Sequence, residues 1–380
     1  MNTVPYIFAL KAIALLSGAL IVYVLFDWSR HLSKKRQLPS RKAGAILTRS
    51  AENPILDPNP EHSWEDAAVF NPAACYDGEK VHLLYRAIGS EGVSRIGYAV
   101  SDDGVHFRRF QNPAFIVKTQ TPAKFQNPFS RIGRYDTDAY ASGGGWGGSE
   151  DPRAVLLDGR LYMTFSVFES WDSIRMALTS IDMPDCEKRT WRWTPHLYIS
   201  PPNETHKNWV LFPEKIRGKF ALLHALTPKL MIDYADSPRE WEERPIKSNN
   251  NRGGRAGYWD EFVRGAAAPP MRTKYGWLLL YHGMSPKEGH GYKVGAMILD
   301  INEPTKILYR SNTPILEPKE WYENDGKPGV VYASGAVIKD GTLIVYYGGG
   351  DKRVNVATSQ LDIFLNALIE DKQARLVRTT

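Results

Sequence analysis

The sequence predicts an all-β protein, a five-bladed β-propeller preceded by a single N-terminal transmembrane helix. Three observations lead to this fold class: an apolar run near the N-terminus, a strand phrase that occurs five times, and a composition rich in turn formers. Of the 380 residues, 12% are aromatic, 25 are Pro and 31 are Gly, which favours short strands joined by turns over long helices. The apolar share of 43% and charged share of 24% are those of an ordinary globular protein.

The first element is a predicted membrane anchor. Residues 5–26 read PYIFALKAIALLSGALIVYVLF, close to the roughly 20 residues needed to cross a bilayer. Lys11 interrupts the run; it could snorkel to an interface, or it could belong to a signal peptide whose apolar part is 12–26. The run is followed by Asp27, Trp28 and Ser29 and not by a small-x-small cleavage site. We therefore expect a retained anchor over residues 1–28.

A basic tether over residues 29–50 follows the apolar run. Its positive charges are Arg30, Lys34, Lys35, Arg36, Arg41 and Lys42. By the positive-inside rule they would keep the large domain in the cytoplasm, so a single-pass, membrane-anchored enzyme is expected; the alternative is a solvated linker with orientation set otherwise. The whole-chain charge is only +6, so no basic stripe and no nucleic-acid partner is expected. Cys75 and Cys186 lack zinc-site spacing, so no metal is expected.

The remaining chain, residues 51–380, repeats a phrase of three strands. The first strands read NPAACYDGEK from 71, DPRAVLLDGR from 151, FPEKIRGK from 212, APPMRTKYG from 268 and SGAVIKDGT from 334. Each leads through a Gly turn into an aromatic-rich strand (VHLLYRA, LYMTFSV, FALLHAL, WLLLYHG, LIVYYGG) and then a third strand. Five such cycles predict five propeller blades whose first strands line a central channel. The alternative is a β-sandwich with accidental similarity. Residues 108–149 are expected to form a loop insertion, and 363–376 a closing helix.

The propeller geometry predicts one polar pocket around the axis. The starts of the inner strands contribute Asn71, Glu150, Asp151, Glu214, Arg264 and Ser334. The ends of the second strands add Arg86, His282 and Asp351, among the aromatic residues Tyr85, Trp146, Trp259, Tyr281 and Tyr347. Carboxylates, bases and aromatic faces in one pocket suit a sugar, because aromatic rings stack on pyranose faces and carboxylates hold hydroxyl pairs.

Each candidate also has a purely structural interpretation. Asp151 and Arg153 could form an ion pair that braces a turn, although the preceding GGGWGG permits close backbone approach. Glu214 could pair with Lys215. Asp260 and Glu261, in YWDEFVRG, could cap a loop.

The chain resembles a known family at these residues. NPAACYDGEKVHLLYRA, RIGYAVSDDGVHF, GSEDPRAVLLDGRLYMTFS, LFPEKIRGK, GWLLLYHGM, ILYRSNTPILEP and VYYGGGD are similar to motifs of glycoside hydrolase family 130, the β-mannoside phosphorylases and their hydrolase relatives. The resemblance covers about 53–361, with the motifs in the family's order. It implies a five-bladed propeller, in agreement with the repeat count.

The resemblance also implies roles for particular residues. Asp151, in the EDPR motif, would be the general acid, and Asn71, Arg86 and Asp351 would help to hold the mannosyl ring. Candidates for binding phosphate are Arg153, Arg175 and Lys207; in the hydrolase branch, two glutamates would act instead, with Glu214 and Glu261 as counterparts. Glu150, Trp259, Asp260 and His282 complete the predicted substrate-binding set.

The chemistry expected of such a site is inverting cleavage by single displacement. Water as nucleophile needs a second carboxylate as base, whereas phosphate needs a cationic cradle instead. Ala225, in LHAL, stands where phosphorylases of the family have a basic residue, which speaks against phosphate; abundant cytoplasmic phosphate speaks for it. We expect phosphorolysis of a β-linked manno-oligosaccharide to mannose 1-phosphate, with inorganic phosphate as co-substrate and no cofactor. The alternatives are hydrolysis and a non-catalytic glycan-binding propeller. Glu150 is expected to raise the pKa of the acid, Asp151.

Overall fold

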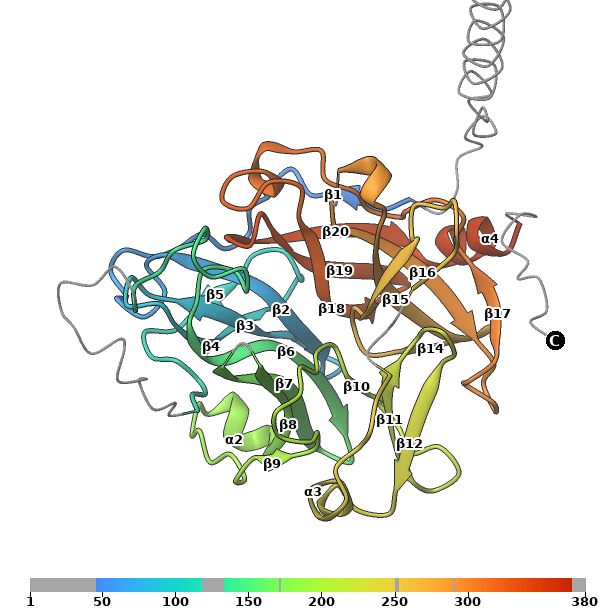
Figure 1. Cartoon of the computed structure of the whole chain (residues 1–380), viewed down its shortest axis with the longest axis horizontal. Helices are drawn as coiled ribbons and strands as arrows, with labels where there is room; N and C mark the ends of the chain where they lie inside the picture. The colour runs from blue at the N-terminus through green and yellow to red at the C-terminus, as the bar shows by residue number, and fades with distance from the viewer. Residues whose placement is uncertain (1–45, 118–132, 171, 250–252, 290, 371–380) are drawn as a thin grey trace, which may run out of the picture. The chain divides into compact units, whose positions relative to one another are not determined.

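The computed structural model describes residues 46–117, 133–170, 172–249, 253–289 and 291–370. The described part of the chain contains five antiparallel units of three strands (Figure 1). In the third and fourth units the inner strand precedes the repeated phrase, which starts at 212 and at 268. The units are β2 (Ala68–Tyr76), β3 (Val81–Ile88) and β4 (Val93–Ser101); β6 (Gly147–Leu157), β7 (Arg160–Ser170) and β8 (Ser173–Asp182); β10 (Val210–Leu211), β11 (Phe220–Ala225) and β12 (Met231–Ala235); β13 (Phe262–Ala266), β15 (Gly276–Met284) and β16 (Lys293–Leu299); and β18 (Val331–Lys339), β19 (Thr342–Gly349) and β20 (Arg353–Gln360).

Shorter elements extend these units or connect them. The additional strands are β1 (Thr48–Arg49), β5 (Arg108–Arg109), β9 (Leu197–Tyr198), β14 (Met271–Thr273) and β17 (Ile307–Arg310). The helices are α2 (Met183–Glu187), α3 (Arg239–Glu243) and α4 (Leu361–Glu370), with 3₁₀ turns η2 (Pro286–Glu288) and η3 (Trp321–Glu323). The predicted closing helix over 363–376 thus begins two residues earlier, at Leu361.

The predicted fold class, a closed five-bladed propeller behind a transmembrane helix, is corrected by the structure. The strands form four sheets, of four, three, five and eight strands, and these sheets do not close on one another. The eight-stranded sheet arises because β4 and β6 pair in parallel, Val93 with Gly147 and Ser94 with Gly148. A Cβ at Gly148 would stand 2.1 Å from the Ser94 carbonyl oxygen, so the missing side chain permits this approach. The part of the predicted fold class that the structure supports is a protein built mainly of β-sheets.

The predicted membrane anchor is corrected as well. In the described part of the chain, no helix combines the length and hydrophobicity of a membrane span. The longest helix there, α4, has 10 residues and is about 15 Å long, half of a bilayer's hydrocarbon core. The predicted single-pass, membrane-anchored location is therefore not supported. The predicted span at 5–26 lies outside the described residues, and the domain boundaries at 28 and 50 stay predictions.

The core explains why the second strand of each unit is so apolar. Every residue of β3 is buried, and β15 and β19 are buried over nearly their whole length. A strand covered on both faces reads as a continuous apolar run instead of an alternating one. The apolar side chains of neighbouring units pack into shared clusters; one of them joins strands of the fourth and fifth units to α4. The units are thereby held together by apolar packing between sheets.

Backbone irregularities recur where the inner strands approach the candidate site. The pairing register shifts in β2 between Phe70 and Ala73 and in β6 between Glu150 and Arg153. Inside these two bulges, Asn71 and Asp151 adopt φ angles of 47° and 49°. Positive φ is uncommon outside glycine, and Asn and Asp tolerate it best. Bulges re-aim side chains, so the repeated NP and DP dipeptides mark two equivalent bulges.

Candidate active site

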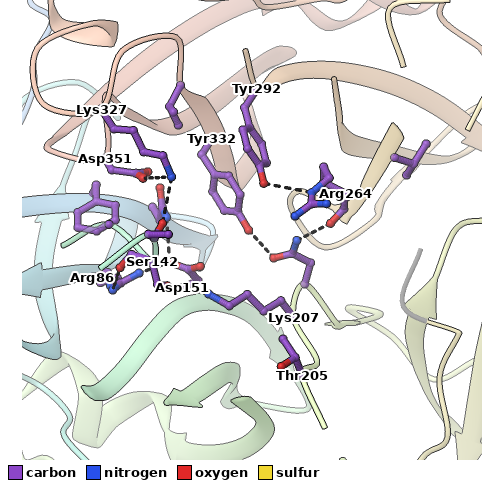
Figure 2. Close-up of a pocket in the computed structure, with 17 residues that line it drawn as sticks. Arg86, Ser142, Asp151, Thr205, Lys207, Arg264, Tyr292, Lys327, Tyr332 and Asp351 are labelled. Carbon is purple, nitrogen blue, oxygen red and sulfur yellow. Dashed lines mark hydrogen bonds and ion pairs between the residues drawn. The ribbon is translucent and has the colours of Figure 1, made fainter. Parts of the chain in front are cut away.

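A cavity of about 220 Å³ lies among the inner strands and the loops that precede them (Figure 2). It draws residues from four of the strand units and from the loop that leads into the third, which explains why no single stretch of sequence reveals it. Its lining comprises Phe70, Asn71, Arg86, Ala141, Ser142, Gly143, Asp151, Thr205, Lys207, Asn208, Val263, Arg264, Tyr292, Lys327, Val330, Tyr332 and Asp351. Four of these side chains are cationic and two are carboxylates. The cavity therefore has an excess of positive charge.

Asp151 lies at the centre of the polar contacts. Its Oδ1 accepts a hydrogen bond from Asn71 Nδ2 at 2.8 Å and one from Arg86 Nη1 at 3.3 Å. The residue is only 5% exposed, and its left-handed backbone in the β6 bulge turns the side chain out of the alternation of the strand. Asn71 occupies the equivalent bulge in β2. The two bulges thus bring an amide donor to a carboxylate across two strand units.

Glu150 supports this cluster from behind the cavity surface. Its Oε1 accepts from Arg86 Nη2 at 2.9 Å, and its Oε2 accepts from Ser142 Oγ at 2.7 Å and Lys207 Nζ at 3.1 Å. Glu150 is fully buried and is not part of the lining. A buried carboxylate with two cationic partners and a hydroxyl donor is well compensated. Glu150 therefore fixes the positions of Arg86 and Lys207.

The charge state of Asp151 differs from the sequence-based expectation. Burial alone would raise the pKa of Asp151, but Arg86, Lys207 and Arg153 outweigh burial and hold the pKa below its usual range. Glu150 was expected to raise it. Because Glu150 is itself paired with Arg86 and Lys207, its charge is already neutralised by the cations that act on Asp151. With its pKa held below the usual range, Asp151 is ionised at neutral pH.

Asp351 is the second carboxylate of the cavity, and it behaves in the opposite way. It lies in the β19–β20 turn with a φ of 51°, and its Oδ2 is 3.6 Å from Lys327 Nζ. Burial raises the pKa of Asp351, and the charge of Asp151 raises it further, although Lys327 acts against both. Lys327 also donates to the carbonyl oxygen of Ala141 at 3.0 Å, so it ties the loop before β18 to the glycine-rich loop.

We expect Asp351→Asn to be more stable than the wild type at pH 7. A folded-state pKa above the unfolded value means that ionisation of Asp351 destabilises the fold, progressively as pH rises through that pKa. Asparagine does not ionise, so the gain should shrink toward about pH 4, where about half of the unfolded aspartates are protonated. Urea denaturation midpoints at both pH values measure this. Lys327→Met is the matched control: it leaves Asp351 without its cation and should lower stability at pH 7. A less stable Asp351→Asn at pH 7 would contradict the prediction.

A second polar group lines the cavity across from Asp351. Figure 2 shows Arg264 and Tyr292 on one side of Tyr332, with Asp351 and Arg86 on the other. Asn208 links the two sides: its Oδ1 accepts from Arg153 and from the Tyr332 hydroxyl, and its Nδ2 donates to the carbonyl oxygen of Arg264 at 2.7 Å. The Arg264 Nε donates to the Tyr292 hydroxyl at 3.1 Å. This side therefore offers hydroxyl groups and one exposed guanidinium.

The structure brings together several of the residues that the sequence singled out. The cavity lining includes Asn71, Arg86, Asp151, Lys207 and Asp351, and also Arg264. Their roles stay predictions, but their positions agree with a shared site.

Two predicted residues lie just behind the cavity. Arg153 is buried, and it donates to the carbonyl oxygens of Ala267 and Asp151 and to Asn208. Its guanidinium is thus committed to the protein, and it braces Tyr332 from behind. His282 is fully buried and stacks on Tyr332 with ring centroids 3.9 Å apart. Burial lowers the pKa of His282 to about 3, so it is neutral.

The remaining predicted residues do not lie on this cavity. Glu214 is on the surface, paired with Arg272 at 2.5 Å. Glu261 contacts Ser285 Oγ at 3.4 Å and Lys287 at 3.9 Å. Neither glutamate is therefore placed to act as a base in this cavity.

The other three predicted residues, Trp259, Asp260 and Arg175, contact protein groups away from the cavity. Asp260 is buried with Arg255, Arg310 and the Tyr281 hydroxyl, and Trp259 stacks on Tyr281. Arg175 donates to the carbonyl oxygen of Ser200 and covers the ring of Tyr198 at 3.9 Å. Trp259 and Asp260 precede the inner strand β13, and Arg175 lies on β8, the third strand of the second unit, so none of the three stands at the cavity end of an inner strand.

Sequence reasoning missed six polar lining residues. They are Ser142, Thr205, Asn208, Tyr292, Lys327 and Tyr332. Asn208 and Tyr332 lie close to the starts of inner strands β10 and β18. The rule that selected Asp151, namely that residues at the starts of inner strands face the pocket, would have found them if the predicted strand starts were moved by a few residues. Lys327 and Tyr292 come from loops, for which the strand repeat offers no signal.

Strand units that converge on a cavity with carboxylates, cations and tyrosines are the arrangement expected of a glycoside-cleaving β protein. The model of glycoside hydrolase family 130, described as beta-1,4-mannooligosaccharide phosphorylase, matches residues 135–370. The 1,2-beta-oligomannan phosphorylase of Thermoanaerobacter sp. is 36% identical over 83% of this chain and 97% of its own length. A beta-1,2-mannobiose phosphorylase of the same organism is 33% identical over 82% and 96%.

A solved structure agrees with these sequence matches. The beta-1,2-mannobiose phosphorylase of Listeria innocua, in complex with beta-1,2-mannobiose, superposes with a TM-score of 0.61 at 25% identity, covering 85% of this chain and 99% of its own. The chain belongs to glycoside hydrolase family 130, as its motifs predicted.

Proposed function

We propose that this enzyme cleaves β-mannosides by phosphorolysis and releases α-mannose 1-phosphate. The observation that carries the proposal is the charge of the cavity: Arg86, Lys207, Arg264 and Lys327 outnumber Asp151 and Asp351. Phosphate arrives as an anion and must be desolvated, which needs cationic donors at hydrogen-bonding distance. The named activities of the relatives in Thermoanaerobacter support the same reaction. Inorganic phosphate is then a co-substrate.

The proposed reaction is a single displacement at the anomeric carbon. A phosphate oxygen attacks C1 from the face opposite the leaving group, the bond from C1 to the glycosidic oxygen breaks, and that oxygen takes a proton from Asp151. Inversion converts the β-linkage into an α-phosphate ester. Asn71, Arg86 and Asp351 would hold the mannosyl ring, since they surround Asp151 on the enclosed side of the cavity.

An anionic co-substrate would also raise the pKa of Asp151, which the surrounding cations lower. The cations around it lower its pKa, which disfavours the protonated form that a general acid needs. Phosphate bound beside Lys207 would offset part of that positive charge and so raise the pKa of Asp151. The proposal therefore predicts that phosphate binding and protonation of the acid favour each other.

Hydrolysis fits the cavity less well. An inverting hydrolase needs a carboxylate base for water, standing about 6.5–9.5 Å from the acid. Glu214 and Glu261, the sequence-based candidates, lie away from the described lining. Among the described residues, Asp351 is the other carboxylate that lines the cavity besides Asp151. Burial raises the pKa of Asp351, which would make it a stronger base. Lys327 is paired with it, however, and this cation favours the ionised carboxylate over proton uptake.

The linkage proposed for the substrate is β-1,2. The support is that the three relatives of higher identity are named for β-1,2-linked mannosides. The family description and two less similar relatives are named for β-1,4 or 4-O-β linkages. The full chain should be incubated with β-1,2-mannobiose and with β-1,4-mannobiose, each with and without inorganic phosphate. We expect α-mannose 1-phosphate from the β-1,2 substrate only when phosphate is present. Release of free mannose irrespective of phosphate would overturn phosphorolysis.

Lys207 is expected to set the affinity for phosphate. It lines the cavity, and its contacts with Glu150 and Ser142 hold its ammonium beside Asp151. Lys207→Met keeps the length of the side chain and removes the charge, so we expect the KM for phosphate to rise about 10- to 100-fold, the loss of roughly 1.5–3 kcal/mol of a charge-assisted hydrogen bond. Initial rates against phosphate concentration measure this. Lys215→Met, on the surface, is the control, and an unchanged KM in Lys207→Met would remove Lys207 from phosphate binding.

A further inference from the structure

A buried carboxylate with a tyrosine and an arginine lies at the start of the segment that leads into β18. Glu323, the last residue of η3, is fully buried. Its Oε1 accepts hydrogen bonds from the Tyr347 hydroxyl of β19 at 2.8 Å and from Arg49 Nε of β1 at 2.7 Å. Its Oε2 accepts from Arg49 Nη2 at 3.0 Å and from the backbone amides of Lys319 and Glu320 at 2.6 and 2.9 Å. We call Arg49, Glu323 and Tyr347 the fifth-unit triad.

The same combination of residues occurs in two other strand units. The carboxylate precedes the inner strand, the tyrosine lies on the second strand, and the arginine lies on an outer strand (β5, β17 or β1) that pairs with the third. The counterparts are Glu65, Tyr85 and Arg109 in the first unit, and Asp260, Tyr281 and Arg310 in the fourth. The triad is thus a recurring feature of three units, and not an accident of one loop.

The fifth-unit triad lies just before both partners of the ion pair in the cavity. Lys327 comes four residues after Glu323, and Asp351 comes four residues after Tyr347. Lys327 Nζ is 3.6 Å from Asp351 Oδ2, and Figure 2 shows the two side chains next to each other. The hydrogen bond from Tyr347 to Glu323 therefore joins the two segments shortly before each of them reaches the cavity.

The ion pair depends on how these segments are held. The Lys327 side chain is 40% exposed, and an ion pair with an exposed partner contributes little stability by itself. Two backbone hydrogen bonds link the segments near the cavity, from the Lys327 amide to the Gly350 carbonyl oxygen and from the Gly350 amide to that of Val330. The triad adds a link inside the core, where a buried carboxylate with an arginine partner and further donors has a fixed position.

We propose that Arg49, Glu323 and Tyr347 are positioning residues for the reaction. They hold the segment of Lys327 against the turn between β19 and β20, so that the Lys327 ammonium stays beside Asp351. None of the three is among the residues that line the cavity, so they act through Lys327 and Asp351 and not through contact with the substrate. The proposal rests on the proposed function only in taking this cavity as the reaction site.

The test compares two neighbouring tyrosines of β19 in the full chain. Tyr347→Phe removes the hydroxyl that donates to Glu323. Tyr346→Phe is the matched control, because Tyr346 is also buried and donates at 2.7 Å, but to the carbonyl oxygen of Gly104, which does not line the cavity. Both variants lose one buried hydrogen bond and should lose similar stability in urea. At saturating phosphate, we expect Tyr347→Phe to lower kcat/KM for β-1,2-mannobiose about 2- to 10-fold, the usual contribution of one hydrogen bond, and Tyr346→Phe less than twofold.

A double-mutant cycle tests whether the effect of Tyr347 passes through Lys327. Because residues that act through one another are not additive, Tyr347→Phe/Lys327→Met should have a kcat/KM within twofold of that of Lys327→Met alone. Three results would overturn the proposal: losses that multiply in the double variant, equal losses in Tyr347→Phe and Tyr346→Phe, or an unchanged kcat/KM in Tyr347→Phe.

The proposal and the proposed function fail separately. The rate is measured as disappearance of mannobiose, so the cycle applies whether the product is mannose 1-phosphate or free mannose. A second measurement needs no turnover: the coupling between Lys327→Met and Asp351→Asn in urea denaturation at pH 7, determined with Tyr347 and with Tyr347→Phe. Weaker coupling with Tyr347→Phe supports the positioning role even if the enzyme is a hydrolase, and equal coupling rejects it even if phosphorolysis is confirmed.

Discussion

Asp151→Asn should lower the rate of mannose 1-phosphate release by about 10²- to 10⁴-fold, the usual contribution of a general acid. The asparagine keeps an oxygen that can accept from Asn71 Nδ2 and Arg86 Nη1, so the left-handed bulge and its contacts are expected to persist. Binding of a β-1,2-mannoside, measured by calorimetry, should change far less than turnover. The combination separates loss of the proton donor from loss of the site.

The matched control for this substitution is Glu214→Gln. It is the same change of acid to amide at a residue that the sequence also put forward as catalytic, but Glu214 lies on the surface with Arg272. We expect less than a twofold change in turnover. Wild-type turnover in Asp151→Asn would remove Asp151 from the mechanism, and a large loss in Glu214→Gln would mean that the cavity described above is not the reaction site.

Arg86→Leu should destabilise the protein by about 3–5 kcal/mol, as expected when one partner of a buried ion pair is removed. Arg86 is 1% exposed and contacts the carboxylates of both Glu150 and Asp151. Leucine leaves both charges buried without this partner. Urea denaturation at pH 7 measures the loss. Arg160→Leu, which breaks an exposed pair with Asp182, is the control and should cost no more than about 1 kcal/mol.

The stability loss of Arg86→Leu should depend on pH in a definite direction. In the wild type, the pKa of Asp151 lies below its unfolded value, so its ionised form stabilises the fold above that value and the contribution is lost as pH falls. Without Arg86, burial dominates and raises the pKa of Asp151. The deficit of Arg86→Leu should therefore be largest near pH 7 and shrink toward about pH 4. The double variant Arg86→Leu/Glu150→Leu should recover part of the stability; a deficit independent of pH, with no recovery, would contradict the ion-pair explanation.

The sequence predicted most of the strands, and it predicted several residues that the structure places around one cavity. Both predictions have one physical reason. A strand buried on both faces leaves an apolar run, and a short turn leaves Gly, so the five phrases were readable without knowledge of the fold. Asn71 and Asp151 precede proline at the start of such phrases, and the structure places both in equivalent bulges of β2 and β6. The repeat therefore pointed to the right strand ends in the first two units.

The same reasoning failed where loops decide positions. In the third unit, the repeat pointed to Glu214, but the inner strand β10 is only Val210–Leu211, so the residue at the cavity is Asn208 and Glu214 lies beyond the strand. The sequence also could not predict which side chains pair with a buried charge. The sequence predicts that the negative charge of Glu150 acts on Asp151. In the structure, Arg86 and Lys207, which come from distant parts of the chain, form ion pairs with Glu150 and neutralise that charge. The repeat predicted closure of the sheets, which the structure does not show, and it gave no sign that two units merge through Gly148.

The paired bulges in β2 and β6 have a consequence for how this enzyme can change. The backbone of the two bulges directs the side chains of Asn71 and Asp151 toward each other. The distance between these side chains therefore depends on the strand pairing, which the packing of the core stabilises. The loops that carry Tyr292 and Lys327 lie outside the long strands and are paired by a single bridge, between Tyr292 and Val330. Selection for new substrates should therefore accumulate changes in those loops while the proton donor keeps its place, so that one rigid reaction centre can serve a succession of different sugars.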